Sequence, residues 1–475
     1  MPYGRVPTFP WTTGLFLTSK SISHGKESKK IKTEKGLRLK IVNPDSAGID
    51  IADKEIQVCV PEDRDGENNR RFGSFTRDLH EICSWLHACR IRTVAMEATG
   101  IYWLNLYLML RDAGIDVILA NPLQVKNLMD EKTDEADAEW LMLMHSYGMV
   151  KPSFQPENIT RKIRNLTRHR SNLLESASVE ILHMQKAMEM MNIKLSTVIS
   201  DVTGKSGQAI IRAIVAGNHD PASLSQLADG RCKASKETIA MSLEGTWEDD
   251  VLFMLEQSLK AYDFYQEQVE DCNNKIESLL MEYAAAIDTK GTEFVRTKKS
   301  AAHKNVLTFD MEKYAFDIWG VNVRAIPGMN VGSMLQLVGE LGHDFVDKFD
   351  TCRKFCKWCN IVPSNKISGG KLLSSHLPKR KNPVGQIFRM CANAVKDEKT
   401  EMGNYFRRLK SRSGSAQAIV ATAHKIARIF YTMIKNRQEY NAKLVGSDEK
   451  ELLIRKIERA KKALFKLDQR LAEAS

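Results

Sequence analysis

Two long amphipathic runs constrain the fold of this 475-residue chain more than any other feature. Their apolar residues recur mostly at three- and four-residue steps: Ile159, Ile163, Leu166, Leu173, Ala177, Met184 and Met188, then Leu255, Leu259, Tyr262, Val269, Ile276, Leu280 and Tyr283. This spacing predicts two long helices, which form an antiparallel helical hairpin or an intermolecular coiled coil. Polar residues interrupt both stripes, so a perfect zipper is not expected; they are Arg170, Glu180, Gln266 and Asn273.

The segment before the first run alternates between strand and helix patterns. Two short β-branched runs in 46–59 predict a hairpin, and a third strand is expected at 71–75. A helix follows with Thr76 as its N-cap, then a strand at 92–96, a helix at 102–113, a strand at 115–120 and a helix at 134–146. This order predicts an α/β domain over residues 46–155, close to the usual size of a domain.

The remaining chain divides less sharply. We expect a basic flexible tail at 1–45, the helical region with an insertion at 156–285, a linker at 286–322, a second compact and mainly α-helical domain at 323–440, and a charged packing or oligomerisation helix at 441–475. The second domain opens with a glycine-rich turn at 327–332. That turn is similar to a helix-hairpin-helix element whose amides hold DNA phosphates, or is an ordinary tight turn.

Positive charge is concentrated in two places. The chain has 70 Lys and Arg against 59 Asp and Glu, a net charge of +11, yet residues 1–40 alone carry +7 and residues 351–382 carry +8. Basic segments on a slightly acidic body indicate a polyanionic partner, most often nucleic acid, although a solvated tail and loop would give the same pattern. No apolar run approaches the roughly 18 residues of a membrane span, which excludes an integral membrane protein. Nine scattered cysteines fit reduced thiols in a cytoplasm.

Four acidic residues form the first candidate site. Asp50 lies within the first predicted strand and Glu97 ends another, each beside apolar residues where a carboxylate needs a compensating cation. Asp134 and Asp137 lie three residues apart at the start of a helix and so project from one face. Together the four would supply oxygen ligands suited to Mg²⁺. Taken singly, Asp134 could be a helix N-cap and Asp50 could stabilise a turn.

The second candidate is Ser368, which precedes Gly369 and Gly370. There the backbone can approach a ligand closely, and Lys366, Lys371, Lys379 and Arg380 could offset phosphate charge. An activated serine could attack a phosphodiester. The alternative interpretation is that this segment is a flexible loop without a nucleophile. Neighbouring serines compete with Ser368; they are Ser364, Ser374 and Ser375.

A zinc site is the less favoured interpretation of a nearby cysteine group. Cys352, Cys356 and Cys359, with His376, superficially resemble a set of zinc ligands. The surrounding sequence is helix-like and places Cys356 and Cys359 on one face, so packed thiols are expected instead.

The order of these motifs resembles the DEDD transposases of the insertion-sequence-110 family. The segments that carry the resemblance are Gly48-Ile49-Asp50, Met96-Glu97-Ala98-Thr99-Gly100 with Tyr102, Asn121-Pro122, Lys132-Thr133-Asp134-Glu135-Ala136-Asp137-Ala138, Ile326-Pro327-Gly328, Asn360-Ile361-Val362-Pro363 and Ser368-Gly369-Gly370-Lys371. They cover about residues 46 to 435 in the family's order. Several weak motifs in the correct order are far more specific than any one of them.

The resemblance implies a RuvC-like mixed sheet and a DNA recombinase that cuts and rejoins an insertion sequence. It implies that Asp50, Glu97, Asp134 and Asp137 bind Mg²⁺ and that Ser368 forms a phosphoserine link to DNA. It also implies a structured bridge RNA that pairs with target and donor DNA, and a homomultimer in which the acids of one protomer meet the serine of another.

One departure and two alternatives remain open. After the serine the family commonly has Lys-x-Gly-Asn, whereas this chain has Lys379-Arg380-Lys381-Asn382, which puts the phosphate contacts of Lys379 in doubt. The first alternative is a RuvC-like nuclease or resolvase that hydrolyses DNA with water. The second is an inactive nucleic-acid-binding relative, although a carboxylate cluster facing phosphate would weaken simple binding.

Overall fold

The computed structural model describes residues 40–97, 100–120, 134–287, 294–296, 305–379, 381–442 and six single residues between 457 and 469. The side chains of Asp134 and Glu135 are outside this description. Residues 1–39 of the predicted basic tail, most of the predicted C-terminal helix and Arg380 also lie outside the described residues. The chain divides after Ser153 into two compact units, and each is considered by itself.

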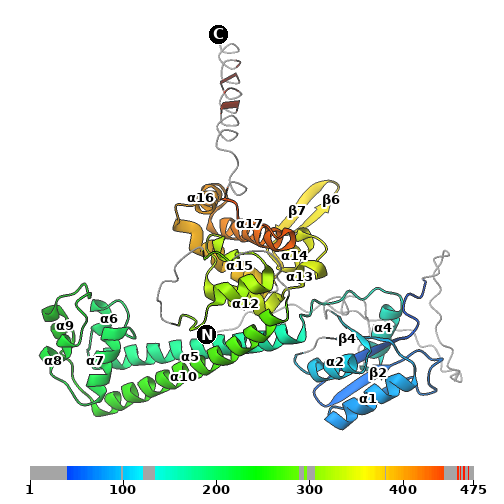
Figure 1. Ribbon diagram of the computed structural model, residues 1–475, viewed down its shortest axis with the longest axis horizontal. Coiled ribbons are helices and arrows are strands. Elements are labelled where there is room, and N and C mark those ends of the chain that lie inside the picture. The colour runs from blue at the N-terminus through cyan, green and yellow to red at the C-terminus, as the bar shows by residue number, and fades with distance from the viewer. Residues whose placement is uncertain are drawn as a thin grey trace, which may run out of the picture. The chain divides into compact units, whose positions relative to one another are not determined.

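A five-stranded mixed sheet organises the first unit (Figure 1). Its order is β3-β2-β1-β4-β5, with bounds β1 Ser46–Ile51, β2 Glu55–Cys59, β3 Asn69–Gly73, β4 Thr93–Glu97 and β5 Asp116–Ala120. The first three strands are antiparallel neighbours, and β1, β4 and β5 run parallel. The predicted hairpin is confirmed, and the third strand begins two residues earlier than expected.

Strand alternation separates the two faces of this sheet. Ile49 and Met96 belong to one buried core with the apolar faces of α1 (Thr76–Ala88) and α2 (Trp103–Asp112). Cys59 on the other face packs against Ala138 of α4 (Asp134–Ser146), whose bounds match the prediction. Successive residues of a strand point to opposite faces, so the residues between those of the α1 and α2 core face α4.

The cap of α1 differs from the expectation. Phe75, not Thr76, is the N-cap residue, and the Asp78 carboxylate accepts a hydrogen bond from the Phe75 backbone N–H at 2.9 Å. Asp78, the third helical residue, therefore satisfies the backbone N–H of the cap residue itself, whereas a threonine cap would accept from an amide of the first turn.

The second unit contains the two long helices that the periodicity predicts, α5 (Asn158–Met190) and α10 (Asp249–Ala285). They pack antiparallel, since Thr160 hydrogen-bonds Tyr283 and Arg170 hydrogen-bonds Asn273. Two of the polar interruptions thus satisfy one another across the buried seam. The chain between the long helices forms α6 (Leu195–Val198), α7 (Lys205–Val215), α8 (Pro221–Gln226) and α9 (Lys236–Ser242), which cap one end of the pair (Figure 1).

The largest hydrophobic core of the second unit lies in its C-terminal part. The elements there are α11 (Met311–Trp319), η2 (Val323–Ala325), α12 (Val331–Leu341), α13 (Phe345–Lys348), α14 (Cys352–Trp358), β6 (Ser364–Ser368), β7 (Lys371–His376), α15 (Pro383–Ala394), η3 (Val395–Asp397), α16 (Glu401–Ser413) and α17 (Ser415–Asn436). Helix α11 falls within the predicted linker. Its Phe316 and Trp319 are buried, so this stretch is part of the folded core.

An ion-pair group around the buried Glu340 ties this core to α5. Arg168 of α5 donates two hydrogen bonds to the Glu340 carboxylate of α12, and Arg164 lies 3.2 Å from the same group. Glu340 is only 7% exposed, and the paired guanidinium groups offset its desolvation. Among the helices that the structure describes, none has the length and apolarity needed to cross a membrane.

Candidate functional site

Asp50 and Glu97 occupy adjacent positions on neighbouring parallel strands. The parallel ladder pairs Gly48 with Ala95 and Ile49 with Met96, so extending the same register by one residue sets Asp50 opposite Glu97. Both carboxylates are half-buried and lie on the α4 face. On its other side Asp50 pairs with Gln57, which is 5% exposed and donates a hydrogen bond to Asn69 at 2.7 Å.

Helix α4 lies very close to the sheet at Gly48. A β-carbon on Gly48 would lie 2.2 Å from the carbonyl oxygen of Ala138 and 2.3 Å from the amide nitrogen of Met142. Only glycine therefore permits this contact. Because the glycine stands two residues before Asp50 on the same face, the contact holds α4 over the strand that carries the carboxylate.

The helix runs antiparallel to β1 and β4. Its end lies at the start of these strands, where Thr93 Oγ1 is 2.9 Å from His145 Nε2 and the Val42 amide donates to the Ser146 carbonyl. Its first residue, Asp134, therefore lies toward the strand ends that carry Asp50 and Glu97. The four helical residues from Ala138 back to Asp134 span roughly 6 Å, about the same length as two strand residues from Gly48 to Asp50.

The geometry brings three of the predicted acids to one region of the first unit. Asp50, Glu97 and Asp137 are half-buried. The backbone of Asp134 begins α4 in the same region, while its side chain is not described. An all-oxygen donor set suits a hard divalent cation, and adjacent half-buried carboxylates repel one another unless a cation or proton intervenes. The residue types and their backbone positions fit Mg²⁺.

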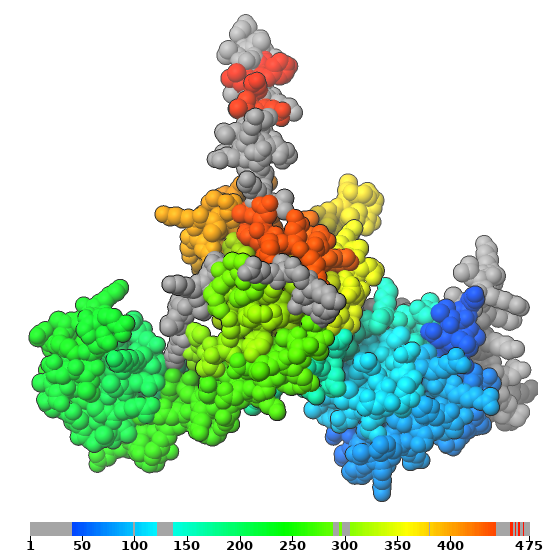
Figure 2. Space-filling view, in the orientation of Figure 1, coloured from blue at the N-terminus to red at the C-terminus, as the bar shows by residue number. Residues whose placement is uncertain are grey.

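Ser368 belongs to the second unit, in an exposed two-stranded ribbon. It is the last residue of β6 and pairs with Lys371 across a turn whose residues, Gly369 and Gly370, have φ values of +54° and +74°. Positive φ at both central positions is typical of a tight hairpin turn and favours glycine. Figure 2 shows the yellow ribbon projecting from the C-terminal part. The predicted flexible loop is thus a hairpin with its serine exposed beside the turn.

The positive charges around the serine are exposed as well. Lys366, Lys371 and Lys379 face solvent, whereas Arg380 is not described. Asn382 has a structural contact: its side chain accepts the Gly385 amide at 3.0 Å as the N-cap of α15 and donates to the Trp358 carbonyl at 3.0 Å. This asparagine of the unusual Lys379–Asn382 stretch therefore joins α14 to α15.

Two family models match the chain in the regions just described. One, for DEDD transposases of the insertion-sequence-110 family, matches residues 47–193, and the other, for the Transposase IS116/IS110/IS902 family, matches residues 321–407. The chain belongs to the insertion-sequence-110 family of transposases. The first match contains the sheet and α4, and the second contains the serine ribbon. No curated protein matches the transposase.

The transposase is an enzyme that acts on DNA, and its other predicted motifs have structural explanations. Cys356 and Cys359 are fully buried next to Phe355, and all nine cysteines are free thiols. His376 is exposed on β7, apart from this packed helix face, which supports packed thiols over zinc. Gly328 has φ +80°, and a β-carbon there would lie 2.3 Å from the Cys391 carbonyl oxygen, so this turn packs tightly against α15.

Two features of the transposase were not predicted from its sequence. Gln57 stands beside Asp50, and the strict alternation of β2 could have identified it. Glu157, His343 and Asp344 form a second possible cation group, with ligand atoms all within 4.8 Å of one another. Glu157 is far in sequence from His343 and Asp344, so no sequence motif contains all three. His343 Nδ1 lies 3.0 Å from the Tyr283 hydroxyl and Asp344 pairs with Lys348.

Proposed function

We propose that the transposase is a Mg²⁺-dependent, RNA-guided DNA recombinase whose nucleophile is Ser368. The observation that carries this proposal is the register that sets Asp50 beside Glu97 on the face covered by α4. A purely structural sheet has no need for two neighbouring half-buried carboxylates, since each costs desolvation energy. A metal-assisted phosphoryl-transfer site needs this arrangement.

Asp50, Glu97, Asp134 and Asp137 are the proposed ligands, and the sheet with α4 keeps them in place. Bound Mg²⁺ would polarise a phosphate oxygen and reduce the repulsion between DNA and the acids. The carboxylates would hold the metal ion beside the scissile phosphate. Gly48 would set the distance between β1 and α4, which carry these carboxylates. Nothing in this assignment uses the second group, Glu157 with His343 and Asp344.

Ser368 would attack the phosphodiester from the exposed ribbon. Its hydroxyl loses a proton, a bond forms between Oγ and phosphorus, and the phosphorus–oxygen bond to one sugar breaks. That sugar leaves as a hydroxyl after taking up a proton. In the reverse step the hydroxyl of a new strand attacks the phosphoserine and releases the serine, so no external energy source is needed. Lys366 and Lys371 flank the serine and would offset the phosphate charge.

The proposed guide is a structured bridge RNA, which the resemblance to the family supports. Base pairing would read sequence, and the basic segment at 351–382 would contact the backbone. The proposed active form is a homomultimer. Exposed apolar side chains on the long helices support self-association; they are Leu182, Met190, Phe253 and Phe264.

A strand-exchange assay tests the metal and RNA parts of this function. Junction DNA is incubated with the protein, the transcript of the flanking non-coding segment and Mg²⁺, and recombinant DNA is quantified. Asp50→Asn and Glu97→Gln should each lower product by more than about 100-fold, because even outer partners of a metal site cost roughly 10–100-fold. Asp53→Asn is the matched control, since Asp53 is exposed just beyond β1.

Two results would reject parts of this function. Unchanged exchange after chelation of divalent ions would reject the metal, and unchanged exchange after removal of the transcript would reject the guide. Free 5′-phosphate ends without joined product would indicate the nuclease or resolvase instead. DNA binding with no chemistry under any condition would indicate the inactive relative.

A further inference from the structure

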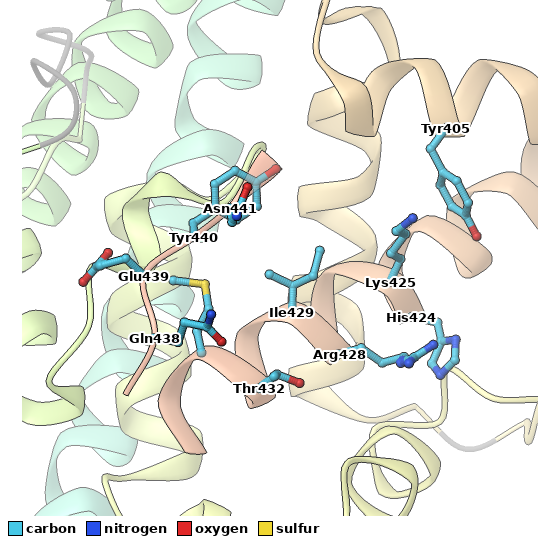
Figure 3. Close-up of a pocket in the computed structure, with 11 residues that line it drawn as sticks. Tyr405, His424, Lys425, Arg428, Ile429, Thr432, Gln438, Glu439, Tyr440 and Asn441 are labelled. Carbon is cyan, nitrogen blue, oxygen red and sulfur yellow. The ribbon is translucent and has the colours of Figure 1, made fainter. Parts of the chain in front are cut away.

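A cavity in the second unit lies apart from every residue assigned above. It has a volume of about 420 Å³ and is formed by α16, α17 and the segment that follows α17 (Figure 3). The chain supplies Tyr405 from α16, then His424, Lys425 and Arg428 from α17, and Tyr440 from the following segment. None of the five proposed catalytic residues lines it.

Two cationic side chains, Lys425 and Arg428, gather at one side of this cavity beside His424, whose pKa is lowered by burial and by Arg428 so that its imidazole is a neutral hydrogen-bonding group. Figure 3 shows His424, Lys425 and Arg428 near Tyr405, with Glu439 at the opposite side. The Glu439 carboxylate accepts a hydrogen bond from the Asn322 backbone amide at 3.1 Å. Burial, then the charges of Arg408 and Arg428, lower the pKa of Lys425, which shows that these cations repel one another. An anion placed among them would relieve this repulsion.

An aromatic ring adjoins these cations. The Lys425 ammonium lies 4.3 Å from the centroid of the Tyr405 ring, and the Arg408 guanidinium lies 5.7 Å from it. Both distances are within the range of cation–π contacts. A ring with cations at its face is the combination with which proteins hold a stacked base and its phosphate. Tyr440 lines the other side of the cavity, and burial raises the pKa of its hydroxyl to about 12, so it stays a neutral donor.

The size of the cavity suits one nucleotide. Small-molecule sites typically have volumes of roughly 300–1,000 Å³, and this cavity is at the lower end of that range. A base stacked within a duplex cannot enter such a recess, whereas an unpaired base can be inserted while its phosphate stays near the surface. Arg428 is exposed and can reach that phosphate.

We propose that this cavity binds one unpaired nucleotide of a nucleic acid strand, with the phosphate at Arg428, Lys425 and His424 and the base at Tyr405. The shared chemistry is a phosphodiester attached to an unstacked base, which a single-stranded RNA or a displaced DNA strand can supply. The assignment does not depend on the serine chemistry or on Mg²⁺.

Photo-crosslinking of the full chain tests this site. The protein carries Ser368→Ala, so that no serine–DNA link contributes to the product. It is mixed with 12-nucleotide single strands that contain one 4-thiouridine in the RNA arm or one 4-thiothymidine in the DNA arm. After irradiation, mass spectrometry maps the attached peptides. We expect attachment to a peptide from residues 401–441 in at least one arm, and the arm that reacts identifies the source of the strand.

Variants separate a nucleotide site from general positive charge. The double change Lys425→Ala with Arg428→Ala should lower this attachment at least about fivefold, and Tyr405→Ala should have a similar effect because base–aromatic stacking contributes about that factor or more. Tyr405→Phe keeps the ring and should retain attachment. Lys435→Ala removes a charge from the same helix outside the cavity and should also retain it.

Two results would overturn the proposal. The first is attachment only outside residues 401–441 in both arms. The second is attachment within that region that neither the double change nor Tyr405→Ala reduces. Thermal unfolding of each variant is recorded in parallel, so that loss of folding is distinguished from loss of binding. If an alanine variant is destabilised, Arg428→Lys, which keeps the charge, should still bind the strand.

Discussion

Gly48 of β1 lies so close to α4 that a β-carbon on it would be 2.2 Å from the carbonyl oxygen of Ala138. This contact fixes the distance between the strand that carries Asp50 and the helix that carries Asp137. It also explains why a glycine precedes the aspartate by two residues, since positions two apart on a strand share a face. The placement of the acids therefore depends on a residue that has no side chain.

Gly48→Ala should destabilise the first unit. Overpacking a tight contact typically costs about 1–3 kcal/mol, and here the obstacle is backbone, which cannot rotate away. We expect a lower midpoint in chemical unfolding of this unit, followed by hydrogen exchange of peptides from residues 46–120, together with loss of strand exchange. Gly66→Ala is the matched control, because nothing lies within 4 Å of a β-carbon there. Equal midpoints for the two variants would contradict the role of Gly48.

The turn of the serine ribbon predicts a graded series at residue 369. Asparagine tolerates the left-handed conformation that Gly369 adopts at φ +54°, whereas valine is strained there by roughly 1–2 kcal/mol. Gly369→Val should therefore open the ribbon and lower strand exchange. Gly369→Asn should keep the ribbon paired and leave strand exchange unchanged. Limited trypsin digestion at Lys366 and Lys371 provides the measurement. If the valine variant is cut no faster than the wild type, the turn does not hold the ribbon.

His145 predicts how the first unit responds to acid. Burial lowers its pKa from 6.5 to about 4, so the folded unit keeps a neutral imidazole beside Thr93. The unfolded chain takes up a proton below about pH 6.5, and stability is therefore lost as the pH falls from about 6.5 to about 4. The loss is on the order of 3 kcal/mol. His145→Gln should weaken the pH dependence of the free energy of unfolding measured in urea. If the free energy of that variant declines equally steeply with falling pH, other groups cause the dependence.

The exposed phenylalanines of α10 predict the determinants of self-association. Phe253 and Phe264 are 60% and 55% exposed, and burying them in an interface would stabilise a multimer. The double change to serine should weaken association by at least about tenfold in sedimentation velocity, since a central interface residue contributes more than about 1 kcal/mol. Phe75→Ser removes a phenylalanine that is 71% exposed on the first unit and should leave association unchanged. If Phe75→Ser weakens association and the α10 double change does not, the interface does not lie on α10.

Elements with clear periodicity were predictable from the sequence. The two long helices and α4 satisfy the expected pattern because each buries one continuous stripe. The α5 and α10 stripes also contained the polar pair Arg170 and Asn273, which looked like defects. Sequence alone could not show that two such residues meet, because the meeting depends on the register of helices far apart in the chain.

Elements that depend on tertiary contacts were less predictable. Helix α11 was expected to be linker because its neighbourhood is polar and poorly periodic, yet Phe316 and Trp319 are buried in the core. The hairpin of β6 and β7 was expected to be a loop because both of its faces are exposed, so no alternation marks it. Likewise, Tyr405 and Arg428 are brought together by the packing of α16 on α17, which no local motif encodes.

The most direct test of the central claim is recovery of a covalent protein–DNA adduct. Wild-type protein and its Ser368→Ala and Asp50→Asn variants are incubated with Mg²⁺, the flanking transcript and junction DNA, then denatured and mapped by mass spectrometry. We expect an adduct at Ser368 in the wild type and none in either variant, because the serine and the carboxylates act in one reaction. Cleavage that persists in Ser368→Ala but is lost in Asp50→Asn would contradict this expectation and leave a metal-dependent nuclease.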